Sequence, residues 1–350
     1  MSRKKGVILS YVGLIIDILS GMIYVPFLLR SLGQAEYGIY SLTTTISSYL
    51  LLLDLGIGNA LVRYMAKYRV NKEDENQSKF YGLSIIFYTA IFLIAIIVGV
   101  ILCLIFPSAF SKGLTVEEIK LAQKLLFVTM LNAGFTLLFV TFSKLLIAYE
   151  KYTAAKLIDM IKVIVRVSGC TLMLVFGAKS LAITIVNLAS TILMGIVTII
   201  YVKSKIKIKP KFKNLQFSFI KEILNYTAFI LLQMIVVQIN TMTDQVLIGA
   251  LVEASAIILG IYAAGAQICQ YFKAIALSVN GIIMPGVVEL VENKATTEDI
   301  YKEFLKISRI LFIILGIIWV GFLINGKYFI ELWAGQDASD AYYVALIIML

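Results

Sequence analysis

The chain has 350 residues, of which 60% are hydrophobic and only 15% are charged. This composition cannot supply the polar surface that a water-soluble protein of this length needs. The formal net charge of +10 does not indicate nucleic-acid binding, because the basic residues gather in alternate loops and form no face interleaved with aromatic side chains. Histidine is absent, which excludes His-based catalytic triads, His metal sites and His proton switches.

The sequence gives no sign of a cofactor or metal. Cys103, Cys170 and Cys269 lie far apart inside apolar stretches, and no pair has the CxxC spacing of a zinc or redox site. We interpret them as small packing residues. A phosphate-binding loop and a segment large enough for a nucleotide-binding domain are both absent, so we expect no ATP hydrolysis by this chain.

Apolar stretches of about twenty residues recur along the chain, and each can cross a hydrocarbon core of roughly 30 Å. The first is too long for a signal peptide and contains Asp17, so we expect it to remain as a helix. A tenth stretch begins near residue 341 and reaches the last residue, which predicts a chain that stops partway through a crossing. The complete predicted spans are 6–29, 37–60, 80–106, 121–148, 157–177, 181–202, 223–250, 256–284 and 304–325.

Most Lys and Arg residues fall in alternate loops, which places the N-terminus in the cytoplasm. The most basic loop, Lys203–Lys213, has Lys at every second position and contains Pro210. We expect this loop to be extended and to lie against anionic lipid headgroups. The simpler alternative is an ordinary basic loop that joins two halves of the protein.

This basic loop divides the chain into three predicted parts. They are an N-terminal six-helix lobe (1–202), a basic cytoplasmic linker (203–222) and a C-terminal lobe (223–350) that is cut in its last helix. A weak repeat supports the division, since Tyr37-Gly38-Ile39-Tyr40-Ser41 matches Leu259-Gly260-Ile261-Tyr262-Ala263 at three positions. We therefore predict an all-α bundle of two pseudo-symmetric lobes, the second one incomplete, around a central polar cleft.

Ionisable residues inside the spans are the candidate functional residues, because each costs roughly 2.5–3.5 kcal/mol on insertion. Asp159, Lys162 and Arg166 share one face of the fifth span. Polar residues also recur on one face of the seventh span and at three-residue steps on the eighth. Alternatively, these charges form structural ion pairs or extend to the membrane surface. The candidate substrate-binding residues are Arg166, Lys273, Asp17, Asp244, Asn240, Gln270, Arg30 and Arg63.

Two segments, PFLLRSLGQAEYGIY at 26–40 and LDLGIGNALVRY at 53–64, carry a resemblance to a known family. They resemble the oligosaccharide flippases, or polysaccharide biosynthesis proteins, of the multidrug/oligosaccharidyl-lipid/polysaccharide exporter superfamily. The resemblance implies two helical lobes that open alternately to each side of the bacterial inner membrane. It also implies a substrate, an oligosaccharide linked to undecaprenyl pyrophosphate, and contacts with polysaccharide assembly proteins.

In that family, cationic side chains of the cavity contact the pyrophosphate, and polar side chains contact the sugars. Carried over to this sequence, the resemblance makes Arg166 and Lys273 the first candidates for pyrophosphate contacts, followed by Arg30 and Arg63. Two other functions remain open. A proton- or sodium-coupled multidrug antiporter would use Asp17 and Asp244, although cations outnumber carboxylates within the spans. A membrane glycosyltransferase or polymerase would need a catalytic outer loop, and the longest such loop, 107–120, has two Glu but no Arg cluster.

Overall fold

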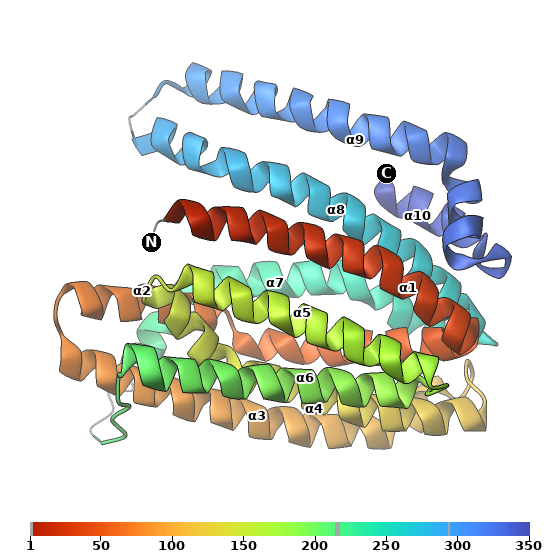
Figure 1. Ribbon diagram of the computed structural model, residues 1–350, viewed down its shortest axis with the longest axis horizontal. Helices are drawn as coiled ribbons and strands as arrows, with labels where there is room; N and C mark the ends of the chain where they lie inside the picture. Colours follow the sequence, from red (N-terminus) through yellow and green to blue (C-terminus); the bar gives the residue numbers. More distant parts are fainter. Residues whose placement is uncertain (1–2, 214–217, 293–294) are drawn as a thin grey trace. The chain divides into compact units, whose positions relative to one another are not determined.

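The computed structural model describes residues 3–213, 218–292 and 295–350, which form helices and turns with no β-strand among them (Figure 1). Contacts group the chain into two compact units. Unit 1 is Met1–Tyr24 with Ser31–Leu259, and unit 2 is Val25–Arg30 with Gly260–Leu350. The α-helices are α1 (Arg3–Ser48), α2 (Ile57–Val70), α3 (Asp74–Phe110), α4 (Val116–Ala148), α5 (Tyr152–Val175), α6 (Ser180–Tyr201), α7 (Ser218–Leu251), α8 (Ser255–Glu292), α9 (Thr297–Ala334) and α10 (Ala341–Met349).

Seven helical stretches of the described chain are long and apolar enough to cross a membrane. This confirms the prediction of an all-α, multi-pass membrane protein. Helix α5 is not among the seven, because Lys156, Asp159, Lys162 and Arg166 interrupt its apolar sequence. The seven stretches are Ile18–Val70, Asp74–Phe110, Val116–Ala148, Ser180–Ile206, Ile230–Leu251, Ser255–Leu277 and Thr297–Ala334.

Helix α1 is two helices joined at Gly33. The backbone there has φ 75° and ψ 167°, a conformation that glycine adopts without steric cost and that an α-helix cannot contain. The break falls in the gap predicted between the first two spans. Because the chain changes direction at this point, the segment after Gly33 can follow a different path from the segment before it.

The second predicted span, 37–60, is wrong in one respect, since it is not a single helix. After α1 the chain forms a 3₁₀-helix, η1 (Tyr49–Asp54), and then adopts left-handed conformations at Leu55 and Gly56 before α2 begins. The Tyr88 hydroxyl of α3 donates a hydrogen bond to the Asp54 carboxylate at this break. Asp54, the acidic residue of the 53–64 segment that carries the family resemblance, therefore has a partner inside unit 1.

Helix α4 is the central element of unit 1, where it contacts α2, α3, α5 and α6. Its N-terminus is closed by a capping box between Thr115 and Glu118. Two apolar clusters form the core around it. One joins α2 to α3 and α4 and contains the fully buried Tyr88 and Leu145. The other joins the opposite half of α4 to α1 and α3 and includes Leu259 at the boundary of the unit.

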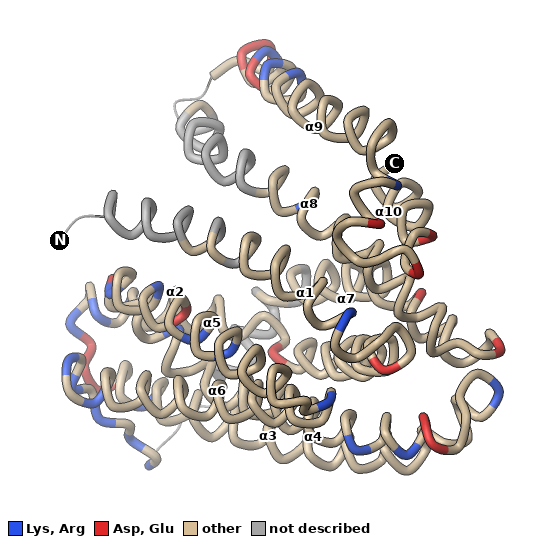
Figure 2. The backbone as a smooth tube through the Cα atoms, turned by 45° about the vertical axis from the view of Figure 1, so that its right-hand side comes forward, with Lys and Arg blue, Asp and Glu red and all other residues tan. Residues whose placement is uncertain are grey.

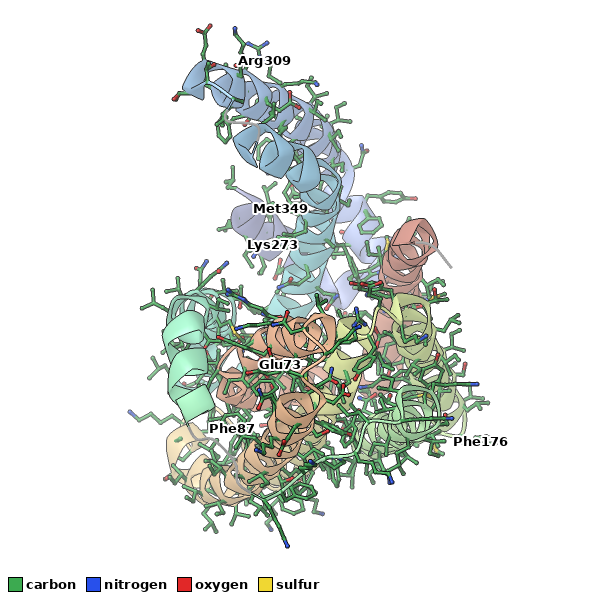
Figure 3. All side chains as sticks on the ribbon, turned by 90° about the vertical axis from the view of Figure 1, so that its left-hand side faces the viewer. Glu73, Phe87, Phe176, Lys273, Arg309 and Met349 are labelled. Carbon is green, nitrogen blue, oxygen red and sulfur yellow. The ribbon has the colours of Figure 1, made fainter. Side chains whose placement is uncertain are left out.

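Lysine and arginine gather at one end of unit 1, here called the basic end (Figure 2). It consists of the end of α2, the start of α3, the α4–α5 turn and the Lys203–Lys213 segment. Arg69 at the end of α2 pairs with Glu150 in the α4–α5 turn at 3.3 Å. Glu73, labelled in Figure 3, accepts hydrogen bonds from Asn76 (2.8 Å) and Asn71 (3.0 Å), which hold the pKa of its carboxyl below the usual range.

The Lys203–Lys213 segment is only partly extended, which corrects the prediction. Its first residues belong to a π-helical turn, η2 (Val202–Ile206), because they continue α6. From Lys207 to Lys213 the chain has no helical structure, and the Lys211 amide donates to the Ser78 carbonyl of α3 at 3.0 Å. The alternation has a structural meaning: the six Lys side chains are exposed, whereas Ile206 and Ile208 pack against the core.

Besides Val25–Arg30 of α1, unit 2 contains α8 from Gly260 onward, α9, a 3₁₀-helix η3 (Gln336–Ala338) and α10. Helices α8 and α10 approach closely, since a Cβ at Gly265 would lie 2.7 Å from the Ala341 carbonyl oxygen. Cys269 is buried and its thiol donates to the Ile348 carbonyl, as expected for a packing residue. Helix α7 belongs to unit 1, where it contacts α2 and α3. The predicted lobes 1–202 and 223–350 stay a prediction, because contacts do not measure pseudo-symmetry.

Glycine at position 82 is expected to be required for docking of the basic segment on α3. In a Gly82→Ala variant the new Cβ would lie 2.1 Å from the Lys211 carbonyl oxygen, so the backbone of the segment must move away. Loss of one hydrogen bond and its packing, about 1–2 kcal/mol, should raise the rate of tryptic cleavage within 207–213 about tenfold. Gly316→Ala, where a Cβ meets nothing within 4 Å, is the control. Equal cleavage rates in both variants would contradict the docking.

Candidate functional site

Helix α5, one of the helices that contact α4, carries a charged face. Asp159, Lys162 and Arg166 are spaced by three and four residues and therefore share one helical face, as predicted. Asp159 pairs with Lys156 at 4.0 Å and also interacts with Lys162. Lys162 and Arg166 are both half-buried and lie close enough to repel each other. This places two positive charges one turn apart on a helix inside a membrane protein.

The half-buried Arg166 lies among polar groups from three helices of unit 1. Its guanidinium interacts electrostatically with Tyr24 and Tyr40 of α1 and with Cys170 of α5. The Asn187 side-chain amide of α6 donates to the Tyr40 hydroxyl at 3.2 Å. Cys170 in turn donates weakly to the Asn187 side-chain oxygen at 3.7 Å. A guanidinium beside phenolic hydroxyls and an amide can bind a phosphate and neighbouring sugar hydroxyls.

Glu36 fixes the position of this cluster on α1. Its carboxylate accepts hydrogen bonds from the Ser180 amide at 2.9 Å and from the Ser180 hydroxyl at 2.7 Å, at the first residue of α6. A negative charge at a helix N-terminus is favourable, because the amide groups there point toward it. Tyr40 follows Glu36 by one helical turn and Asn187 follows Ser180 by two turns. The Glu36 contact therefore sets the register that brings Tyr40 to Asn187.

A second polar network joins α1 to α7 in unit 1. The side-chain oxygen of the buried Gln245 accepts hydrogen bonds from Thr45 (2.6 Å) and Ser41 (3.2 Å). About two helical turns earlier on α7, the Gln238 side chain donates a hydrogen bond to the Ser48 hydroxyl at 2.6 Å. The predicted polar stripe of α7 lies on another face, since Asn240 is exposed. Gln238 and Gln245 were not predicted as polar contacts, because their positions on α7 lie outside the spacing of that stripe.

The predicted substrate-binding residues are distributed over both units. In unit 1, Arg166 is half-buried in the cluster described above, whereas Asn240 and Asp244 on α7 and Arg63 on α2 are exposed. The side chain of Asp17 lies outside the described residues. Among the described residues, no group of three or more His, Cys, Asp or Glu side chains could hold a metal ion.

Three predicted residues belong to unit 2. Lys273 on α8, labelled in Figure 3, is half-buried and lies near the thiol of Cys269. Gln270 on the same helix is exposed. Arg30 is exposed and donates to the Leu332 carbonyl at 2.9 Å, in the last turn of α9. A cation at the C-terminus of a helix is favourable, so Arg30 has a structural contact of its own.

The sequence matches the polysaccharide biosynthesis protein family over residues 2–291. No curated protein sequence matches the chain significantly. Among solved structures, the lipid II flippase MurJ in an inward closed conformation is similar, with a TM-score of 0.68 and 19% identity over 97% of this chain and 71% of that one.

Two transporters of the MOP superfamily also share the fold. An inward-facing multidrug resistance transporter of the MATE family has a TM-score of 0.60 and 12% identity, over 95% of this chain and 76% of that one. A transporter from Pyrococcus furiosus, described as having a binding pocket of reverse polarity, has a TM-score of 0.51 and 13% identity, over 97% of this chain and 75% of that one. At these identities the similarity shows the fold and leaves the substrate open.

Replacement of Glu36 by Ala is expected to destabilise unit 1. The substitution leaves the Ser180 amide without the carboxylate, and loss of such a cap costs about 1–2 kcal/mol in free energy of unfolding. Denaturant unfolding of the detergent-solubilised protein measures this loss. Lys179→Ala is the matched control, since Lys179 lies 4.0 Å from the same carboxylate with an 80% exposed side chain. Its effect should stay within about 0.5 kcal/mol, and equal effects of both substitutions would refute the capping role.

Proposed function

Because this chain belongs to the polysaccharide biosynthesis protein family, we propose that it is a flippase for an oligosaccharide linked to undecaprenyl pyrophosphate. It would move this substrate by alternating access from the cytoplasmic to the outer leaflet of the bacterial inner membrane, with its N-terminus in the cytoplasm. The family and the similar solved structures comprise transporters and flippases rather than enzymes. Proteins that assemble the polysaccharide would be its functional partners.

The polar cluster around Arg166 is the observation that supports this proposal most. A pyrophosphate brings negative charge to membrane depth, where it needs cations and hydrogen-bond donors in place of water. Lys162 and Arg166 supply the positive charge. Tyr40 interacts electrostatically with Arg166, and Asn187 donates a hydrogen bond to the Tyr40 hydroxyl. We assign Lys273, half-buried on α8, as the corresponding cation of unit 2.

A multidrug antiporter is the second candidate, because multidrug transporters share this fold. It would bind an organic cation through carboxylates, for which Asp17 and Asp244 are the candidates within the spans. The described geometry favours an anionic substrate, since Asp244 is exposed while the half-buried charges on the polar face of α5 are Lys162 and Arg166.

We also propose that the Lys203–Lys213 segment binds anionic lipid headgroups. Two observations support it: the six Lys side chains are exposed, and the backbone is held on α3 through Lys211 and Ser78. A docked segment loses little further entropy when it meets a charged surface, so each Lys can contribute about 1 kcal/mol. The concentration of basic residues at this end also supports its placement in the cytoplasm.

Loss of the cationic groups is expected to abolish transport. We would delete the full-length gene, assay lipid-linked oligosaccharide in each leaflet, and complement with wild-type, Arg166→Ala/Lys273→Ala and Lys124→Ala forms. The double variant should flip substrate at least about tenfold more slowly at equal membrane abundance, because each charge-assisted hydrogen bond is worth about 1.5–3 kcal/mol. Lys124 is exposed on α4 and serves as the control.

One result of this assay would contradict the assigned residues, and another would contradict the flippase. Full activity of the double variant would exclude Arg166 and Lys273 from substrate binding. Normal surface polysaccharide in the deletion strain, together with greater sensitivity to cationic drugs, would instead support the antiporter.

Anionic lipid is expected to protect the basic segment from proteolysis. In nanodiscs rich in phosphatidylglycerol, tryptic cleavage within 207–213 should be several-fold slower than in phosphatidylcholine nanodiscs. The protection should disappear at about 0.5 M salt, where charges are screened within a few ångströms. Cleavage at Lys112, on the turn between α3 and α4, is the internal control for access of the protease. Equal cleavage of 207–213 in both lipids would refute the contact.

A further inference from the structure

A pocket of about 610 Å³ opens at the basic end of unit 1, between the α4–α5 turn and the end of α6. We call it the interfacial pocket. Its volume lies in the range of sites that hold a small organic ligand. It is lined by Tyr149, Glu150, Lys151, Thr153, Ala154, Leu157, Ile158, Val197 and Tyr201.

The polar side of the interfacial pocket has a net positive character. Glu150 is the acidic residue in the lining, and Arg69 pairs with its carboxylate at 3.3 Å. The Arg69 guanidinium also lies 5.4 Å from the centre of the Tyr149 ring, which holds it beside the pocket. Since Arg69 offsets the charge of Glu150, the exposed Lys151 determines the sign of the potential at the opening. The hydroxyls of Thr153 and Tyr201 add hydrogen-bonding groups.

The apolar side of the pocket continues into an exposed apolar strip along α5 and α6. On α5, Leu157 lines the pocket, and Ile161 and Ile164 follow on the same face with 47% and 52% exposure. On α6, Val197 lines the pocket and Leu193 lies one turn away on the same face, with 49% exposure. Exposed apolar surface of this extent on a membrane protein is covered by lipid chains.

We infer that the interfacial pocket binds one anionic glycerophospholipid of the surrounding leaflet. Its phosphate lies at Lys151, Thr153 and Tyr201, and an acyl chain follows the strip formed by Leu157 and Val197. A soluble phosphate compound would leave that strip uncovered, whereas a phospholipid matches both sides of the pocket. The site is distinct from the proposed transport site, because Lys151 and Arg166 are separated by about 22 Å along α5.

Native mass spectrometry of the detergent-purified full chain tests this inference directly. Wild-type protein should retain one phosphatidylglycerol per chain more strongly than phosphatidylcholine. Ala154→Trp fills the pocket and should reduce retention at least tenfold, while Lys151→Gln should reduce it about fivefold through loss of one surface cation. Leu104→Trp on α3, at a position with 74% exposure, adds the same indole on a lipid-facing surface and should retain the lipid as wild type does.

Two outcomes would overturn the inference. Equal retention in Ala154→Trp and Leu104→Trp would show that no lipid occupies this pocket. In the other outcome, an undecaprenyl-pyrophosphate oligosaccharide would displace the bound phosphatidylglycerol at a lower concentration than added phosphatidylglycerol does. The pocket would then be a substrate site. The assay of lipid-linked oligosaccharide in each leaflet tests the transport proposal separately. Ala154→Trp changes the interfacial pocket and leaves Arg166 and Lys273 unchanged, so failure of the pocket inference would not imply failure of the transport proposal.

Discussion

In a membrane, polar groups without a hydrogen-bond partner are costly, and apolar helix faces gain little by leaving lipid for one another. Specific contacts between helices therefore depend on polar residues that find partners. Unit 1 follows this rule: Gln245 accepts from Thr45 and joins α7 to α1, and Glu36 accepts from Ser180 and joins α1 to α6. The apolar packing of the helices around α4 is compatible with the helix positions that these hydrogen bonds define.

The interruptions of the helices serve the same requirement. Gly33 separates α1 into two parts, and Glu36 reaches the N-terminus of α6 one turn after the break. This order of residues explains why a glycine and a glutamate stand close together in the segment that resembles the flippase family. The same helix continues to Tyr40, which interacts electrostatically with Arg166 in the proposed transport site. The backbone break at Gly33 thus contributes to the arrangement of the polar cluster around Arg166.

The fold alone does not decide what is transported, because flippases and multidrug transporters share it. The sign of the half-buried charge is the more informative feature. A cluster of Lys162, Arg166 and uncharged polar groups attracts an anion, whereas the exposed Asp244 gives little preference for a cation. At the basic end, the exposed lysines of 203–213 and the interfacial pocket are the features on which we base the proposed contacts with anionic lipid.

Hydropathy and charge were sufficient to determine the class of protein, the position of nearly every helix and the shared face of Asp159, Lys162 and Arg166, because these are local properties of the chain. Only the tertiary structure decided that Tyr40 and Asn187 lie beside that face, that Gln245 rather than Asn240 faces α1, and that α7 belongs to unit 1. The physical reason is that lipid and protein interior are equally apolar. Helical periodicity therefore defines the faces of a membrane helix without identifying the neighbour that each face meets.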